Sequence, residues 1–117
     1  MTHAVATSAE DPTKRALSPA RRRLVELMQW LSFGRILKLP VRNGEPVLDQ
    51  TVRVIRTVKT GADNRPRAES HWRDFVLKRE VMDLFAELGR IGNGVVRLIE
   101  VKHGLPFLIE IEEAVHT

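Results

Sequence analysis

The side chains best suited to chemistry in this chain are its arginines and lysines. Three consecutive arginines, Arg21 to Arg23, begin a predicted helix, and further cations lie on predicted strands and in a loop. The candidate set is Arg21, Arg22, Arg23, Lys38, Arg42, Arg53, Arg56, Lys59, Arg65 and Arg67. Because cations spaced along a sheet and an adjoining loop can follow a phosphate backbone, this set predicts an electrostatic contact with nucleic acid. Arginines in a first helical turn also oppose the helix dipole, which points to an outside partner.

Aromatic side chains limit what kind of nucleic-acid binding is expected. The chain has no tyrosine, two tryptophans and four phenylalanines, and most of these rings fall at predicted core positions. Proteins that bind single strands by stacking need exposed rings. The predicted contact is therefore mostly non-specific, and the sequence does not distinguish DNA from RNA.

Glutamates near the C-terminal end allow two interpretations. Glu110 and Glu112 share one face of a predicted strand, because side chains alternate with period two, and Glu100 lies on the neighbouring strand. Three carboxylates on one face could hold a divalent cation. The alternative is the solvent-facing side of a sheet whose other side carries Ile109 and Ile111. The alternation of acidic and apolar residues favours this alternative.

Motifs for catalysis or phosphate binding do not occur. The four histidines (His3, His71, His103 and His116) show no H-x-x-x-H spacing, and no G-x-S-x-G elbow or phosphate loop is found. Gly89 to Gly92 matches the short G-x-x-G pattern of KH domains, but that loop joins two helices, whereas a strand is expected here. We therefore expect no enzymatic activity, no metal site and no cofactor.

Composition is typical of one globular domain. The 117 residues are 43% hydrophobic and 29% charged, and the absence of cysteine excludes disulfides and zinc–thiolate sites. No apolar run is long enough to span a bilayer, and the first residues lack the apolar region of a signal peptide, so we expect a cytoplasmic protein without membrane contact. Residues 1–60 hold 11 Lys and Arg against 5 Asp and Glu, and residues 61–117 hold 8 against 10. This dipole could attract a polyanion, could align two copies, or could be a chance imbalance on a solvated surface.

The first half of the chain predicts a tail, a helix and three strands. Residues 1–17 lack periodicity and are expected to be a flexible tail. Ser18-Pro19 predicts a helix start and Gly34 its stop. In the strand that follows, residues 35–42, the alternation places Leu37, Leu39 and Val41 on the buried face, and Pro40 indicates an open edge or a bulge.

A tight turn and a β-branched run complete that half. Asn43-Gly44 is a strong hairpin signal because both residues tolerate positive φ. The run from Thr51 to Thr60 predicts a third strand.

The second half predicts a longer helix and a second hairpin. Residues 61–69 read as a loop, and Ser70 can cap a helix from about His71 to Leu88, which is ended by glycines. A strand over 95–102, a turn at His103-Gly104 and a strand over 107–111 follow.

The two halves resemble each other in sequence. Residues 34–48 (GRILKLPVRNGEPVL) and 94–108 (GVVRLIEVKHGLPFL) align without a gap. An apolar helical stretch precedes each, from Leu24 and from Val81, so the second copy is expected to be three residues longer between helix and strand. Pseudo-repeats at about 18–60 and 70–115 predict one helix–hairpin unit used twice.

These observations predict a single α+β domain over residues 18–117. The expected order is α-β-β-β-α-β-β, with a mostly antiparallel sheet and both helices on one face. The expected function is a small non-enzymatic binding protein that contacts nucleic acid through its basic N-terminal half. The alternative is a protein-interaction or self-assembly module that uses exposed strand edges. Pro40 and Pro46 protect the first hairpin, whereas the edge from Phe107 to Ile111 has fewer such guards.

Overall fold

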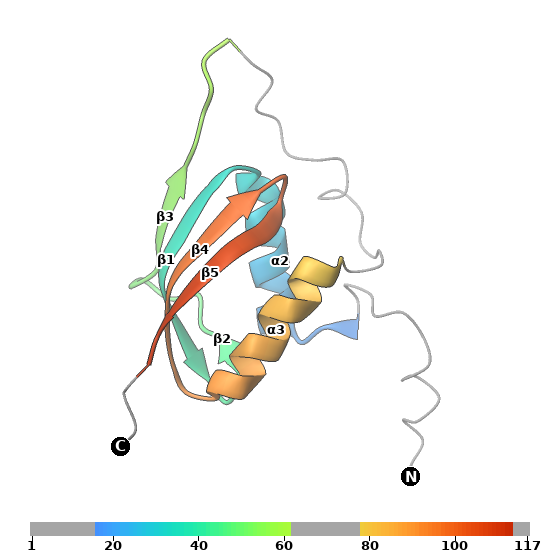
Figure 1. Ribbon diagram of the computed structural model, residues 1–117, viewed down its shortest axis with the longest axis vertical. Coiled ribbons are helices and arrows are strands. Elements are labelled where there is room, and N and C mark those ends of the chain that lie inside the picture. Colours follow the sequence, from blue (N-terminus) through green and yellow to red (C-terminus); the bar gives the residue numbers. More distant parts are fainter. Residues whose placement is uncertain (1–15, 62–77, 114–117) are drawn as a thin grey trace.

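Two helices and five strands make up the part of the chain that the structure, a computed structural model, describes. That part is residues 16–61 and 78–113, so Arg65, Arg67, Ser70 and most of the expected tail lie outside it. The elements are α2 (Pro19–Leu31), β1 (Gly34–Arg42), β2 (Glu45–Pro46), β3 (Arg53–Arg56), α3 (Arg79–Ile91), β4 (Gly94–Lys102) and β5 (Leu105–Glu112). They form one α+β domain with a mostly antiparallel, curled sheet, and both helices lie on one side of it in Figure 1.

Helix α2 begins where the sequence predicts and ends slightly earlier. The Ser18 hydroxyl accepts a hydrogen bond from the Arg21 backbone N–H at 3.2 Å, and Pro19 occupies the first turn. These contacts satisfy a donor that would otherwise lack a partner. The helix stops at Leu31 with Ser32 as its C-cap, so the prediction that Gly34 ends it is wrong, and Gly34 instead begins β1.

Strand β1 departs from simple alternation at its centre. Ile36, Leu39 and Val41 are buried, whereas Leu37 is only half-buried. Lys38 has a positive φ of 61°, and this local kink shifts the phase of the pleat by one residue. The prediction that Leu37 shares the buried face with Leu39 is therefore wrong. The kink lies between the two residues, so their side chains point to opposite faces of the sheet.

The sheet has the order β2-β1-β4-β5, with β3 also pairing with β1. Strand β2 pairs with the C-terminal end of β1 and β3 with its N-terminal end. Pro40 lies between these two ladders, where its carbonyl accepts a hydrogen bond from Val47 N–H at 2.9 Å. This position suits proline, which has no N–H to donate. Strand β5 pairs only with β4 in the described residues.

Several predicted bounds change. The third strand spans Arg53–Arg56 rather than the whole run from Thr51 to Thr60. Helix α3 is described from Arg79, continues through Gly89 and ends at Ile91, with Gly92 as its C-cap at φ 72°. Lys78, the N-cap of α3, has extended backbone, so the prediction of one helix running from His71 to Leu88 is wrong, whereas Ser70 and His71 themselves lie outside the described residues. Both hairpin turns match the prediction, because Asn43-Gly44 and His103-Gly104 have positive φ at both positions.

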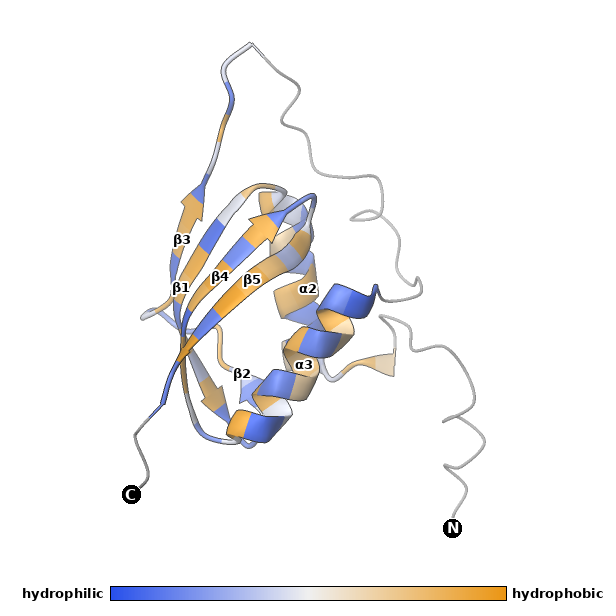
Figure 2. Ribbon diagram, viewed as in Figure 1, coloured by the Kyte–Doolittle hydropathy of each residue, from blue (hydrophilic) through white to orange (hydrophobic). Residues whose placement is uncertain are grey.

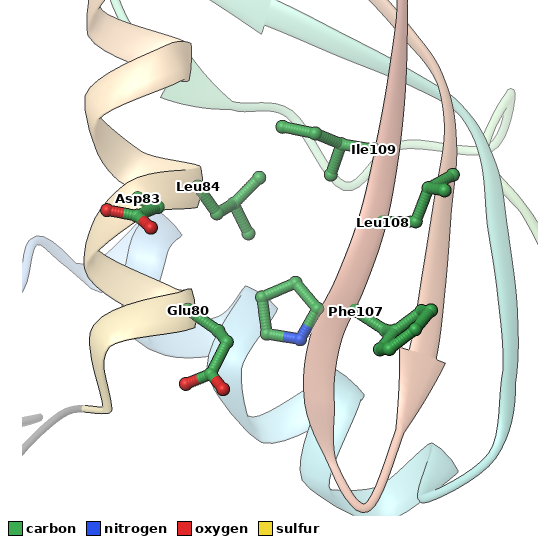
Figure 3. Close-up of a pocket in the computed structure, with 7 residues that line it drawn as sticks. Glu80, Asp83, Leu84, Phe107, Leu108 and Ile109 are labelled. Carbon is green, nitrogen blue, oxygen red and sulfur yellow. The ribbon is translucent and has the colours of Figure 1, made fainter.

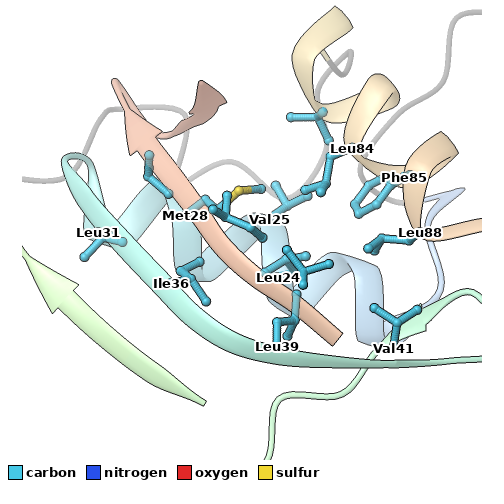
Figure 4. Packing of buried hydrophobic residues seen from close by; sticks show 14 residues of the cluster. Leu24, Val25, Met28, Leu31, Ile36, Leu39, Val41, Leu84, Phe85 and Leu88 are labelled. Atoms are coloured by element: carbon cyan, nitrogen blue, oxygen red, sulfur yellow. The ribbon is translucent and has the colours of Figure 1, made fainter. Parts of the chain in front are cut away.

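The core lies between the helices and one face of the sheet. Figure 4 shows side chains from α2, α3 and β1 converging on it, and Figure 2 shows hydrophobic and hydrophilic bands alternating along both helices. The buried cluster is Leu24, Val25, Met28, Leu31, Ile36, Leu39, Val41, Val81, Leu84, Phe85, Leu88, Val96, Ile99 and Val101. Burying each large apolar side chain contributes about 1.5–3 kcal/mol.

Contacts in the first half have counterparts in the second. Both helices have 13 residues, and two residues separate each from the strand that follows. The expectation that the second half is three residues longer there is wrong. Gly44 N–H donates to Gly92 O at 2.8 Å, and Gly104 N–H donates to Ser32 O at 2.9 Å. These bonds tie each hairpin turn to the helix end of the other half.

Candidate interaction surface

The predicted basic residues on α2 do not form one surface. Arg21 donates from Nη2 to Gly44 O at 3.0 Å, and its Nε lies 3.7 Å from Glu45 Oε1. Its guanidinium carbon is 5.1 Å from the centroid of the Phe85 ring. This side chain therefore joins α2 to the first hairpin and to α3. Arg22 Nη2 donates to Leu17 O at 3.5 Å, at the outer limit of a hydrogen bond, while Arg23 is exposed.

The basic residues on strands divide between two faces of the sheet. Arg53 is paired with Leu37 and Ile55 with Arg35, so these lie on the face turned away from the helices. Arg56 is paired with Gly34 on the helix side, and its guanidinium carbon is 5.3 Å from the centroid of the Trp30 ring. Lys38, Arg42 and Lys59 are exposed. Arg35, which is not one of the predicted basic residues, joins Arg53 on the outer face.

The glutamates of β4 and β5 share that outer face. Glu110 is paired with Leu98, Glu112 with Val95, and Glu100 with both Leu108 and Arg35. Ile109 and Ile111 pack against the core on the other side. Within the described residues, no group of three or more His, Asp or Glu side chains is arranged to hold a metal ion. The face is therefore basic toward β3 and acidic toward β5.

A cavity of about 170 Å³ lies between α3 and β5. It is lined by Glu80, Asp83, Leu84, Pro106, Phe107, Leu108 and Ile109. Figure 3 shows Leu84 and Ile109 pointing toward each other between the helix and the strand, while Phe107 and Leu108 lie on the other side of β5. The cavity thus has an apolar floor with acidic helix residues at its side.

A second, wider groove of about 470 Å³ lies at the opposite edge of the sheet. It runs between α2 and the segment from β2 to β3, and is lined by Arg23, Glu26, Leu27, Leu48, Asp49, Val52 and Val54. Hydrogen bonds from the Thr51 hydroxyl and then from its backbone N–H lower the pKa of Asp49 below its ordinary value. This groove therefore carries charges of both signs.

Ion pairs occupy only some of the charges near β5. Arg90 donates to Glu113 Oε2 at 3.0 Å and to Glu87 Oε1 at 2.9 Å, and hydrogen bonds to Glu113, then Glu87, raise the pKa of Arg90. Asp83 lies 3.8 Å from Arg79, but both side chains are largely exposed, and such pairs contribute little. Glu110 and Glu112 are exposed on β5, which pairs only with β4 in the part of the chain that the structure describes.

Sequence reasoning found the acidic face of β5 but not the cavity beside it. Glu80 and Asp83 occupy polar positions of a helix in the sequence, and nothing in their spacing relates them to β5. Only the packing of α3 over the end of the second hairpin brings Leu84 next to Ile109. No sequence signal in one chain reports that contact.

Comparisons of the chain with protein families, with curated proteins and with solved structures found no match. Neither described helix is long and apolar enough to cross a membrane.

Proposed function

We propose that this protein is a non-enzymatic interaction module that binds an extended protein segment along β5. The observation that carries the proposal is the free edge of β5 beside the cavity under α3. Strand β5 has eight residues and only β4 as a neighbour in the described part of the chain. Its outward N–H and C=O groups are a template for one more strand.

The surroundings of that edge suit a strand with particular side chains. When a peptide adds to a sheet, its backbone supplies affinity, and pockets for alternate side chains supply specificity. Side chains on the helix side would meet Leu84 and Ile109 in the cavity, and those on the outer face would meet Glu110 and Glu112. A segment with a basic residue on the outer face and an apolar residue on the helix side fits both. No proline occurs from Phe107 to Glu112 to prevent pairing.

Peptide titration by fluorescence anisotropy tests this proposal. A labelled peptide of alternating valine and lysine should bind, and one of alternating valine and glutamate should not. Glu110→Lys should weaken binding about five-fold, corresponding to about 1 kcal/mol for an exposed charge pair. Glu26→Lys, the same charge change at the opposite edge, is the control. Equal binding of both peptides, or equal loss in both variants, would refute a site at β5.

A second candidate function is electrostatic binding of nucleic acid. It is favoured by Arg35, Lys38, Arg42 and Arg53, which are exposed on the adjoining strands β1 and β3. Such a strip can neutralise several phosphates, but the nearby acidic residues of β5 oppose a longer polyanion. Arg21 is engaged within the fold and contributes little to this contact.

Anisotropy titrations against single-stranded DNA, duplex DNA and RNA at two salt concentrations test the second candidate. Affinity should fall with salt, and Arg53→Gln should lower the magnitude of the salt slope by about one. Arg79→Gln on α3 removes the same charge away from the strip and should leave the slope unchanged. Absence of binding at low salt would eliminate this function.

We further infer that the domain consists of two copies of one helix–hairpin unit related by a two-fold axis. Gly34 pairs with Val101 and Val41 pairs with Gly94, so exchanging the two aligned segments preserves the register of β1 against β4. The two turn-to-helix hydrogen bonds of Gly44 and Gly104 are also exchanged. Amide hydrogen exchange should therefore give Gly44 and Gly104 similar protection, and fast exchange at one of them alone would argue against equivalent units.

A further inference from the structure

We propose that the segment bound by β5 is β3 of a second copy of this chain, so that copies join edge to edge into a continuous sheet. This inference rests on the proposed function, because it requires β5 to accept a strand. Strands β3 and β5 lie at opposite edges of one sheet, as Figure 1 shows. Each copy therefore carries both of the strands that the contact requires.

Strand direction favours this pairing. Strand β3 is antiparallel to β1, β1 to β4, and β4 to β5, so β3 and β5 run in opposite directions. A second copy moved sideways without rotation would bring its β3 antiparallel to the first copy's β5. Antiparallel pairing is the slightly more stable arrangement, and the outer faces of both copies stay on the same side.

Charges match across the proposed junction. Arg53 lies on the outer face of β3, and Glu110 and Glu112 lie on the outer face of β5. All three side chains are exposed in a single copy. At the junction, opposite charges from the two copies would occupy neighbouring strands, where cross-strand pairs of opposite sign stabilise a sheet.

Apolar side chains match on both faces as well. Val54 and Ile55 are each 40% exposed. Val54 lies on the helix side of β3, and Ile55 lies on the outer side. Next to β5, Val54 would adjoin Ile109 at the α3 cavity, and Ile55 would adjoin Leu108, which is 41% exposed. The α3 cavity of one copy and the α2 groove of the next would then form one continuous hollow under the joined sheet.

The contact uses different surfaces on the two copies, so it leaves a free β3 at one end and a free β5 at the other. Such contacts give open chains unless the geometry closes a ring. Strand β3 has only four residues, and a junction this small belongs to the weak, transient class of interfaces. Assembly should therefore need high protein concentration and should weaken with salt, since exposed charges are screened.

Sedimentation equilibrium of the full chain at low and high salt tests the inference. At low salt the average mass should rise with concentration beyond twice the 13.3 kDa of one copy, and high salt should reverse the rise. Arg53→Glu and the double variant Glu110→Lys with Glu112→Lys should each remain monomeric. Their equimolar mixture should assemble again, because each junction then joins opposite charges. Arg42→Glu, away from β3, is the matched control and should assemble like the parent.

Specific outcomes overturn the inference. A parent chain that stays monomeric at the highest concentration, or an Arg53→Glu variant that assembles like the parent, shows that β3 is not the bound segment. Circular dichroism of each variant confirms that the fold is retained. The valine–lysine peptide titration on Arg53→Glu separates this failure from that of the proposed function, because a monomer that still binds the peptide retains a working β5 edge.

Discussion

The two helices differ in the residue that caps their first turn. The Ser18 hydroxyl accepts from the Arg21 N–H and donates to Glu45 Oε1 at 2.6 Å. The equivalent N-cap of α3 is Lys78, which makes no side-chain cap. Serine is among the preferred residues at this position because its oxygen satisfies an early helical N–H.

We expect Ser18→Ala to lower the free energy of unfolding by about 1 kcal/mol, and Lys78→Ser to raise it by about 0.5–1 kcal/mol. Urea unfolding followed by circular dichroism measures both. A Lys78→Ser variant that is no more stable than the parent would mean that the start of α3 lacks the cap geometry of α2.

The contacts that Arg21 makes within the fold account for a positive charge at this position. Arg21→Met keeps an apolar stem next to Phe85 but removes the bonds to Gly44 O and Glu45. We expect a loss of about 1–2 kcal/mol in the free energy of unfolding, with unchanged nucleic-acid affinity. Arg53→Met should leave the free energy of unfolding nearly unchanged and should weaken nucleic-acid binding. If Arg21→Met unfolds like the parent and loses nucleic-acid binding, Arg21 is a ligand contact rather than a structural tie.

At the scale of elements, the junction of β1 and β3 depends on a close backbone approach. A Cβ atom on Gly34 would overlap with the carbonyl oxygen of Ile55, whereas a Cβ on Gly94 would lie 3.1 Å from the flexible Ile91 side chain. Gly34→Ala should therefore separate β3 from β1. The added Cβ would meet a backbone carbonyl, which cannot turn away as the end of a flexible side chain can.

We expect Gly34→Ala to destabilise the domain by about 2–4 kcal/mol, in the range of overpacking and strain, and Gly94→Ala to cost less than half of that. Unfolding curves give the energies, and the exchange rates of amides in residues 53–56 report whether β3 detaches. Equal effects of the two substitutions would show that the Gly34 contact relaxes easily.

At the scale of the whole molecule, the two halves share one core. Leu24 of α2 and Leu84 of α3 belong to the same buried cluster, and β1 pairs with β4 along most of its length. Among residues 16–61 and 78–113, the buried side chains of both halves form a single cluster. A disturbance in one half should therefore reach the other.

Leu24→Ala and Leu84→Ala should each lower the free energy of unfolding by about 2–5 kcal/mol. Each should reduce amide protection at Ile36 and at Ile99 by similar factors, although these residues lie in different halves. Hydrogen exchange measured by NMR tests this, and a loss confined to the mutated half would reveal two independent folding units.

Local patterns in the sequence determined the class of fold, the start of α2 and both tight turns. Ser18-Pro19, Asn43-Gly44 and His103-Gly104 act within a few residues, so their effect can be read without knowing the rest of the chain. The same holds for the alternation that places Glu110 and Glu112 opposite Ile109 and Ile111. The pleat of one strand decides that arrangement.

Only the tertiary structure decided the phase of β1, the role of Arg21 and the candidate site. The kink at Lys38 leaves Leu37 half-buried on the outer face, and a positive φ at lysine has no marker in the sequence. Arg21 meets Gly44 and Phe85 from distant parts of the chain. The cavity under α3 exists because the helix and the strand edge bring Leu84 and Ile109 to line the same space. Long-range contacts of this kind depend on how elements pack, and the periodicity of a single segment contains no information about its neighbours.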